Sequence, residues 1–253
     1  MYTPTFHHIA LEETDSTNRY LNQICNEQPE LVPEFTTVSA RFQTAGKGQR
    51  GNSWESEKDK NLLFSVVIYP DFLEAKRQFI LSQIVSLAIK EELDNWTRDI
   101  SIKWPNDIYY KERKICGILI ENDLKGYYLG RCICGIGLNI NQEHFFSDAP
   151  NPISLKQITG TEHDCKDLLA RIIQRMQNYY YNLKSHQFEP FAEEINRRYA
   201  DALFRRQGLH VYEDKQGQFR AKLLRVEPDG RFVVTDEHGA IRSYLFKEVQ
   251  YIL

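Results

Sequence analysis

A loop rich in glycine and cationic residues near the start of the chain has the composition of an anion-binding site. Residues 43–54 read Gln-Thr-Ala-Gly-Lys-Gly-Gln-Arg-Gly-Asn-Ser-Trp. The glycines let backbone N–H groups approach a ligand closely, and Lys47 and Arg50 add positive charge. The spacing is neither that of a P-loop nor that of a dinucleotide-binding turn. The segment therefore predicts a site for a phosphate or a mixed anhydride, with a solvated surface loop as the alternative.

A second group of charged residues lies around two strand-like segments. Residues 103–107 read Lys-Trp-Pro-Asn-Asp, and Lys114 begins the apolar run at residues 115–121. A lysine and an aspartate at a strand end could hold a phosphate and its metal ion, although a plain strand terminus with a turn has the same pattern. Lys114 could neutralise an anion in a pocket, the alternative being a solvated strand end. Gly117 permits close approach of a ligand or of neighbouring backbone.

Two polar segments could supply hydrogen bonds to a small molecule. Residues 13–18 (Glu-Thr-Asp-Ser-Thr-Asn) are followed by apolar residues spaced along one helical face, which predicts a loop entering a helix with hydroxyl and amide groups at its start. Residues 135–141 (Gly-Ile-Gly-Leu-Asn-Ile-Asn) end a hydrophobic strand. They suit packing against a flat heterocycle, with a β-bulge as the alternative.

The elements that would position these groups are predicted to form a mixed α+β sheet. Hydrophobic patterning predicts strands at 36–42, 62–69, 100–104, 114–121 and 127–140, and helices at 79–96, 165–183 and 188–203. The strands are grouped and do not alternate strictly with helices. This order favours a mixed sheet over a Rossmann-type parallel sheet.

The last fifty residues predict a separate small β-domain. Short β-type runs at 209–212, 219–226, 232–235, 241–246 and 249–253 are separated by turns that end in glycine. So short a sheet needs closure, which predicts a barrel. We therefore expect one domain over residues 1–203 and a second over residues 204–253.

Composition limits the classes of partner and compartment. The formal net charge is −3, so no overall basic field favours nucleic acid. The five cysteines include no Cys-x-x-Cys pair, which favours buried thiols in a reducing cytosol over disulfides or zinc. Neither a signal peptide nor an apolar run of membrane-spanning length is present in the sequence. These features predict a cytoplasmic protein that binds neither nucleic acid nor membrane.

The order of these motifs resembles the catalytic domain of biotin–protein ligases. The motifs are Asp-Ser-Thr-Asn, Gln-x-x-Gly-x-Gly-x-x-Gly-x-x-Trp, Lys-Trp-Pro-Asn-Asp, Arg-Lys-x-x-Gly-Ile-Leu-Ile-Glu and Gly-x-Asn-x-Asn. The resemblance covers residues 10 to 250 and implies a mixed-sheet catalytic domain followed by a small SH3-like β-barrel. It also implies an enzyme that forms biotinyl-5′-adenylate from biotin and Mg-ATP and transfers biotin to a lysine of a carrier domain.

The resemblance implies a role for each motif residue. In the biotin site it places Ser16, Thr17, Asn18, Gln43, Lys47, Gly48, Gln49, Lys114 and Gly117. In the ATP and adenylate site it places Arg50, Trp54, Lys103, Asn106 and Asn139, with a core role as the alternative for the tryptophan. Lys114, Lys47 and Arg50 would be catalytic because they balance carboxylate and phosphate charge. Asp107 would bind Mg²⁺.

The sequence departs from the family pattern in the glycine-rich loop and at the N-terminus. The family usually has Gly-Arg-Gly-Arg where this chain has Gly-Lys-Gly-Gln, so Lys47 loses the bidentate fork of arginine and Gln49 loses the charge. We hypothesise that the adenylate is held less tightly as a result. Only fourteen residues precede Asp15, which predicts no helix-turn-helix domain and no operator binding.

Two other functions fit parts of the sequence. A lipoate–protein ligase shares the fold and the adenylate chemistry, and incorporation of labelled biotin or lipoate distinguishes the two. A non-catalytic biotin or nucleotide sensor would bind ligand without releasing pyrophosphate. The resemblance implies a biotin carboxyl carrier domain of an acyl-CoA carboxylase as the partner, and it leaves monomer and homodimer open.

Overall fold

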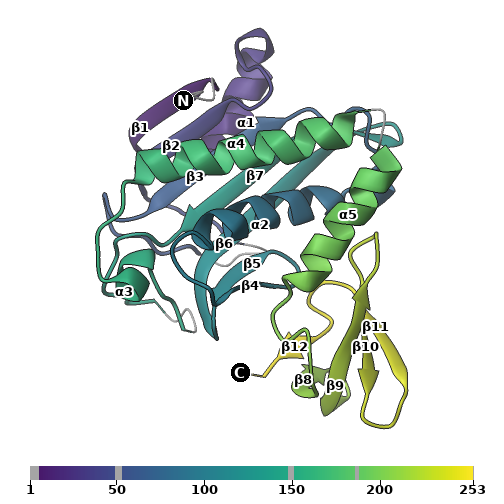
Figure 1. Ribbon diagram of the computed structural model, residues 1–253. Helices are drawn as coiled ribbons and strands as arrows, with labels where there is room; N and C mark the ends of the chain where they lie inside the picture. Colours follow the sequence, from purple (N-terminus) through teal and green to yellow (C-terminus); the bar gives the residue numbers. More distant parts are fainter. Residues whose placement is uncertain (1–5, 49–52, 148–150, 186–187, 253) are drawn as a thin grey trace.

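The computed structural model describes residues 6–48, 53–147, 151–185 and 188–252, which form two β-sheets and the helices that pack on the larger one (Figure 1). The larger sheet contains β1 (His8–Thr14), β2 (Thr37–Gln43), β3 (Leu62–Ile68), β4 (Ile100–Lys103), β5 (Asp107–Tyr110), β6 (Arg113–Lys125) and β7 (Tyr128–Leu138). Its order is β1-β2-β3-β7-β6-β5-β4. The β1–β2 pair is parallel and the other pairs are antiparallel, which confirms the predicted mixed sheet.

Two strands of this sheet were not predicted from the sequence. β1 is an edge strand whose residues are exposed or half-buried, so it carries no run of buried apolar residues. β5 has four residues and pairs with β4 directly across a short turn. Both strands form because backbone groups of a neighbouring strand are available for pairing, a tertiary effect that local hydrophobicity does not report.

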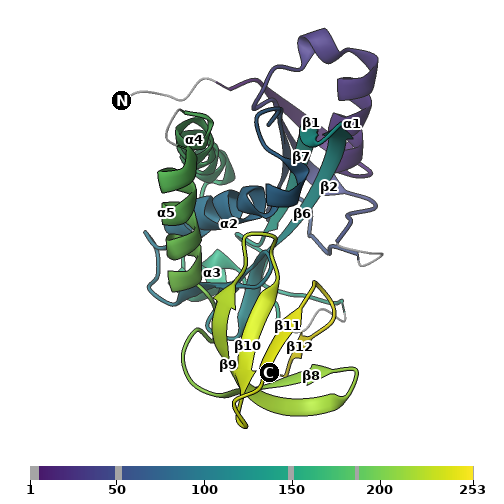
Figure 2. The same ribbon diagram turned by 90° about the vertical axis from the view of Figure 1, so that its right-hand side faces the viewer.

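Helices cover both faces of the larger sheet (Figure 2). The helices are α1 (Thr17–Glu27), α2 (Phe79–Leu93), α3 (Leu155–Thr159), α4 (Cys165–Lys184) and α5 (Phe188–Asp201), with short 3₁₀ turns at Pro29–Leu31 and Ala75–Arg77. α2, α4 and α5 lie on one face and α1 on the other. The predicted helix at 79–96 ends earlier, at Leu93, and the helix at 188–203 ends at Asp201.

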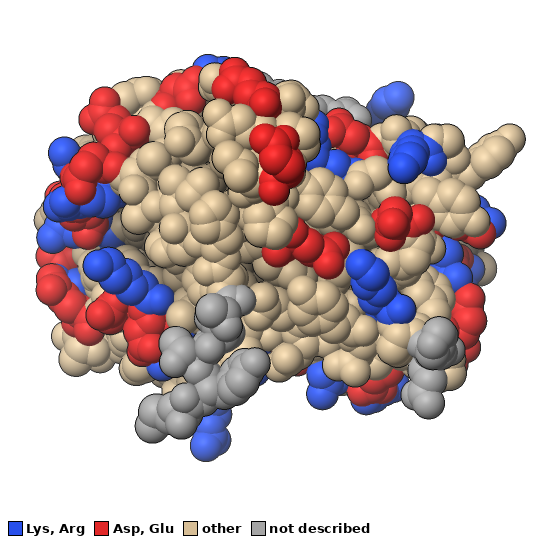
Figure 3. Space-filling view, turned by 90° about the horizontal axis from the view of Figure 1, so that it is seen from above, with Lys and Arg blue, Asp and Glu red and all other residues tan. Residues whose placement is uncertain are grey.

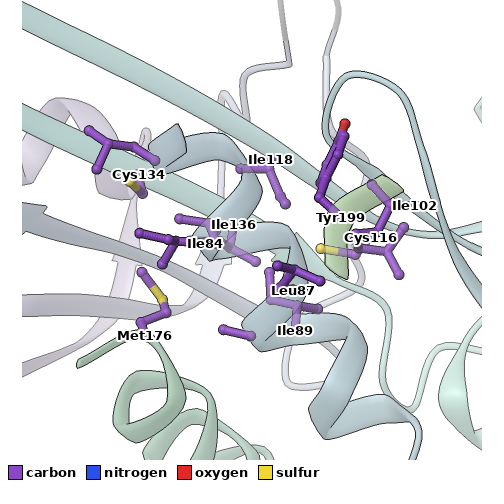
Figure 4. Close-up of a cluster of buried hydrophobic side chains, with 14 of the residues drawn as sticks. Ile84, Leu87, Ile89, Ile102, Cys116, Ile118, Cys134, Ile136, Met176 and Tyr199 are labelled. Carbon is purple, nitrogen blue, oxygen red and sulfur yellow. The ribbon is translucent and has the colours of Figure 1, made fainter. Parts of the chain in front are cut away.

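The alternation of β-strand side chains divides the apolar residues into two cores. Val66 of β3 and Cys134 of β7 face the large core with α2 and α4, whereas Val67 and Ile133 face the small core with α1. Figure 4 shows part of the large core, where side chains from α2, α4, α5 and the sheet meet. α2 is buried on most sides because it lies between the sheet and the outer helices.

The cysteines are thiols, as predicted. All five are free; four are buried and Cys165 is partly buried. Cys132 and Cys134 share one face of β7, and their sulfur atoms lie 3.6 Å apart. Burial raises the pKa of Cys165 to about 11, so this thiol stays protonated at neutral pH.

The C-terminal residues form a second, antiparallel sheet of five strands. It contains β8 (His210–Asp214), β9 (Gly217–Val226), β10 (Phe232–Asp236), β11 (Ile241–Tyr244) and β12 (Gln250–Tyr251), in the order β11-β10-β9-β8-β12. The predicted turn glycines Gly217, Gly230 and Gly239 have φ angles of 114°, 92° and 85°, the left-handed region that glycine favours. In the described part of the chain β11 and β12 are not paired, so hydrogen bonds do not close the sheet into a full barrel.

The second sheet lies against the β4–β5 edge of the first (Figure 1). Ile102 of β4 bonds through its backbone to Ala202 and to Phe204, at the entry to the second sheet. The Trp104 indole N–H donates to the carbonyl of Gly230 at 2.9 Å. β12 also lies close to the end of β4, where the ammonium of Lys103 is 5.2 Å from the centre of the Tyr251 ring.

The face of the molecule seen from above is mixed in charge (Figure 3). On the face shown in Figure 3, lysine and arginine side chains are interspersed with aspartate and glutamate. Among the described helices, none combines the length and apolar character that a bilayer crossing requires.

Candidate active site

A cavity of about 1100 Å³ opens on the α1 face of the larger sheet. Its walls are the N-terminal end of α1, the glycine-rich loop, β6 and β7, the segment between β4 and β5, and the last strand of the second sheet. The lining residues include almost all described residues that the motifs single out: Ser16, Thr17, Asn18, Gln43, Lys47, Gly48, Trp54, Lys103, Asn106, Asp107, Lys114 and Gly117. Gln49 and Arg50 lie outside the described residues.

One end of the cavity is lined by neutral hydrogen-bonding groups, among them Thr17, Asn18 and Gln43. Oε1 of Gln43 accepts hydrogen bonds from the backbone N–H of Thr17 at 2.8 Å and from its hydroxyl at 3.1 Å. The Ser65 hydroxyl lies 2.7 Å from Oγ1 of Thr17 and 2.5 Å from Oδ1 of Asn18. Nδ2 of Asn18 donates to Glu121 at 2.8 Å. These bonds fix the orientation of amide and hydroxyl groups that face the cavity, which suits recognition of a neutral ring with both donors and acceptors.

Two of these positioning residues were not predicted as site residues. Ser65 is the one polar residue in the fully buried strand β3. A single polar residue within a buried apolar strand was the sequence signal that could have identified it. Glu121 closes the Gly-Ile-Leu-Ile-Glu motif. Gly135 leaves room for Asn18, since a β-carbon there would overlap the asparagine side chain.

The middle of the cavity is formed by Trp54 and two glycines. A β-carbon at Gly117 would lie 2.7 Å from the indole, and one at Gly137 would lie 2.5 Å from its Nε1 atom, so the ring packs directly on the backbones of β6 and β7. Indole Nε1 is buried and lacks a hydrogen-bond partner among the described residues. An isolated antiparallel bridge pairs Lys47 with Ser53, directly before the tryptophan. Gly117 thus allows close approach of Trp54, a side chain from another segment of this chain.

The other end of the cavity is cationic. Nζ of Lys114 forms an ion pair with Asp107 at 2.8 Å and lies 5.7 Å from the centre of the Trp54 ring. Nζ of Lys103 donates to the Tyr109 hydroxyl at 3.0 Å. Burial lowers the pKa of Lys103, and the charge of Asp107 opposes this effect. The two ammonium groups give this end a field that favours phosphate or carboxylate.

The two predicted asparagines are used differently. Asn106 lines the cavity, but its Nδ2 donates to the carbonyl of Ile118 at 2.8 Å, so this amide also fixes the turn between β4 and β5. Asn139 is 2% exposed and is not among the cavity-lining residues. Its Nδ2 donates to Ile153 at 3.2 Å, and its Oδ1 is buried with no partner in the described part of the chain.

The outer rim contains residues that the motifs did not indicate. Phe146, Phe246, Lys247 and Tyr251 line the cavity. The first lies on the loop after β7, and the other three lie around β12, more than 100 residues from the nearest motif. Only the packing of the second sheet against β4 brings the last three to the cavity.

The residues present fit a magnesium ion only together with a ligand. No cluster of three or more histidine, cysteine, aspartate or glutamate side chains among the described residues is arranged to hold a metal ion. Asp107 is a single carboxylate in the cavity, and Mg²⁺ is commonly held by one or two carboxylates plus substrate phosphates. This donor set is compatible with a metal that arrives with a nucleotide.

Comparison with known families decides the classification. The model of the biotin/lipoate A/B protein ligase family matches residues 10–139, which include most of β1, all of β2 to β7 and the first four motif regions. The chain belongs to this family.

Individual relatives of this ligase family align over most of the chain. The bifunctional ligase/repressor BirA of Bacillus spizizenii is 25% identical over 244 residues, which cover 94% of this chain and 72% of that protein. The biotin–[acetyl-CoA-carboxylase] ligase of Paracoccus denitrificans is 29% identical over 192 residues, 71% of this chain and 75% of that protein.

A solved member of the family has a similar fold over both sheets. The biotin protein ligase of Aquifex aeolicus in complex with biotin and ATP superposes with a TM-score of 0.77 and 26% identity, covering 97% of this chain and 99% of that one. The similarity therefore extends through the C-terminal sheet, beyond the residues that the family model matches.

Proposed function

We propose that this protein is an ATP-dependent biotin–protein ligase that forms biotinyl-5′-adenylate and transfers biotin to a lysine of a biotin carboxyl carrier domain. The observation that carries the proposal is that one cavity has three parts. One end has neutral hydrogen-bonding groups, the middle has the Trp54 indole packed on two glycines, and the other end is cationic. Biotin has a polar ureido ring, an apolar middle and a carboxylate, so it matches this division in order. The biotin- and ATP-bound Aquifex relative supports the same assignment.

The neutral end suits the ureido ring. Gln43 and Ser65 hold Thr17 and Asn18 in fixed orientations, so these groups need no reordering when ligand binds. We assign Ser16, Thr17, Asn18, Gln43, Lys47, Gly48, Gln49, Lys114 and Gly117 to the biotin site.

The cationic end suits the adenylation step. In that step a biotin carboxylate oxygen attacks the α-phosphorus of ATP, a new C–O–P linkage forms, and the bond to the pyrophosphate oxygen breaks. Lys114 lies where it can reduce the repulsion between carboxylate and phosphate, and Asp107 holds its ammonium at 2.8 Å. Lys47 and Arg50 of the glycine-rich loop add cationic charge.

We assign Arg50, Trp54, Lys103, Asn106 and Asn139 to the ATP and adenylate site, and Asp107 to Mg²⁺. The free Oδ1 of Asn139 supports a role beside the adenine, since it is a buried acceptor that needs a donor. Mg²⁺ bound with ATP would neutralise phosphate charge.

In the second step the carrier lysine amine attacks the acyl carbon, an amide bond forms and AMP leaves.

We propose a boundary between the domains at residues 203 and 204, and a carrier domain of an acyl-CoA carboxylase as the acceptor. The net charge of −3 and the interspersed surface charges favour a protein that does not bind nucleic acid. The free thiols favour the cytoplasm, and either a monomer or a homodimer is compatible with the fold.

Transfer of biotin to a purified carrier domain, with and without ATP, tests the proposal. We expect ATP-dependent labelling and stoichiometric release of pyrophosphate. Ligand binding without pyrophosphate release would instead indicate a sensor, and preferential incorporation of lipoate would indicate a lipoate ligase.

A further inference from the structure

Lys103 is a half-buried cation enclosed by aromatic rings. Its Nζ lies 4.9 Å from the centre of the Tyr109 ring and 5.2 Å from the centre of the Tyr251 ring, and it donates a hydrogen bond to the Tyr109 hydroxyl. Lysine ammonium groups are attracted to the faces of aromatic rings, most strongly where water is excluded. The two rings therefore hold this flexible side chain in one place at the cationic end of the cavity.

Lys103 differs from its neighbour Lys114 in having no carboxylate partner. Lys114 is paired with Asp107, whereas among the described residues no carboxylate lies within ion-pair distance of Lys103. A partly desolvated cation without a direct ion-pair partner is costly unless a ligand supplies negative charge beside it. Lys103 is thus the lysine whose charge is left for an anion entering the cavity.

Tyr251 reaches this lysine from the other sheet. It lies on β12, pairs with Tyr212 of β8, and packs against the rings of Tyr212 at 5.2 Å, Phe232 at 5.7 Å and Phe204 at 6.1 Å. Its hydroxyl is buried without a hydrogen-bond partner in the described residues. Tyr251 therefore contacts the Lys103 ammonium through its ring and not through its hydroxyl.

We propose that Tyr251 is a positioning residue for ATP: its ring holds the Lys103 ammonium in the cavity, so that the C-terminal sheet completes the phosphate-binding end. The inference rests on the proposed function, because it takes the anion that meets Lys103 to be the phosphate chain of ATP. Without the ring, the four-carbon side chain of Lys103 is free to sample solvent, and ATP binding has to order it again.

The test changes the electron density of the ring while keeping its shape. Tyr251 is replaced by phenylalanine and by mono-, di- and trifluorinated phenylalanine, and KM for ATP, KM for biotin and kcat are measured by pyrophosphate release. Tyr251→Phe is the reference variant, and relative to it we expect KM for ATP to rise stepwise with fluorination to about tenfold, the scale of a partly buried cation–π contact. KM for biotin should stay unchanged.

Two comparisons separate positioning from a structural role. Fluorination of Phe219, which lies in the same sheet under Arg242 at 4.2 Å, removes a similar contact away from the cavity and should leave KM for ATP unchanged. In a Lys103→Met background, Tyr251→Leu should add nothing to the loss of ATP affinity.

The outcomes are distinct. A KM for ATP that does not follow fluorination, or a KM for biotin that rises equally, overturns the inference while leaving the ligase function in place. Absence of biotin-dependent pyrophosphate release in the wild-type protein overturns the proposed function itself.

Discussion

The indole of Trp54 lies directly on the backbone of Gly137. A β-carbon at that glycine would be 2.5 Å from the indole Nε1 atom, closer than non-bonded atoms approach. The contact couples the end of the glycine-rich loop to the central strand β7. A movement of the indole away from β7 would change the shape of the middle of the cavity, which Trp54 and Gly137 both line.

Replacing Gly137 by alanine should therefore displace the tryptophan. Overpacking of a rigid contact costs about 1–3 kcal/mol, so we expect affinity for the adenylate to fall about tenfold or more. Isothermal titration with biotin and a non-hydrolysable adenylate analogue measures this loss. Gly130→Ala is the matched control on the same strand, because a β-carbon there would lie 3.3 Å from Cβ of Lys125, an approach that a small shift relieves, and far from Trp54. Equal affinity in the two variants would show that the Trp54 contact is not needed.

Removal of Lys114 should abolish most of the adenylation activity. The residue is the cation paired with Asp107 in the cavity, and loss of one such stabilising group typically costs about 10²–10³ in rate. Pyrophosphate release by Lys114→Ala measures the effect. Lys111→Ala is the control, since its side chain is 63% exposed and paired with Asp99 at 3.7 Å. A near-wild-type rate for Lys114→Ala would contradict the catalytic assignment.

Ser65 should matter for biotin affinity although it is buried beneath the site. Ser65→Ala removes the hydroxyl that meets Thr17 at 2.7 Å and Asn18 at 2.5 Å, which leaves a buried polar group short of a partner. Such a loss costs about 1–3 kcal/mol, so we expect about tenfold weaker biotin binding and a lower melting temperature. Ser86→Ala removes a buried hydroxyl that has no partner among the described residues, and it should change neither quantity much. The prediction fails if both variants bind biotin equally well.

We expect the contact between Glu55 and the loop after β7, near the cavity rim, to depend on pH. Its carboxylate accepts backbone hydrogen bonds from Phe146 at 2.8 Å and Ser147 at 2.7 Å. Burial alone would raise the pKa of Glu55, but these hydrogen bonds outweigh it and lower the pKa below its ordinary value of 4.5. A lowered folded-state pKa means that the carboxylate stabilises the fold above the unfolded-state pKa, and that this stabilisation is lost as the pH falls.

The measurement is the difference in free energy of unfolding between wild type and Glu55→Gln from pH 7 to pH 3.5. We expect a constant difference near neutral pH that shrinks below about pH 4.5, where the unfolded glutamate becomes protonated. Glu57→Gln, at an exposed neighbouring position, is the control. A difference that grows on acidification would have the wrong sign.

Gln49→Arg should slow release of the adenylate. The substitution restores the second arginine of the family loop pattern, and arginine can make two charge-assisted hydrogen bonds to a phosphate. The release rate is measured by diluting the complex with labelled biotinyl-5′-adenylate into excess unlabelled ligand and following the loss of bound label. Gln207→Arg adds the same charge at an exposed position in the C-terminal region and should have no effect. Equal release rates in wild type and Gln49→Arg would reject the hypothesis that this loop holds its ligand loosely.

The sequence by itself determined the local features of this protein. Buried strands such as β3 and β7, the helices α2 and α4, and the glycine-ended turns of the C-terminal sheet follow from hydrophobic period and from the left-handed preference of glycine. The motif residues were noticed because glycine, lysine and asparagine clusters are unusual beside apolar strands, and their roles came from the resemblance of the motif order to the ligase family.

Only the tertiary structure decided how distant segments meet. Ser65 could not be assigned to the site until α1 was seen to pack over β3, and Tyr251 could not be assigned until the second sheet was seen against β4. Asn139 is a motif residue that is 2% exposed and does not line the cavity, so its predicted role beside the adenine stays a prediction. Local propensity fixes which residues form an element, whereas the long-range burial of apolar faces fixes which elements share a cavity.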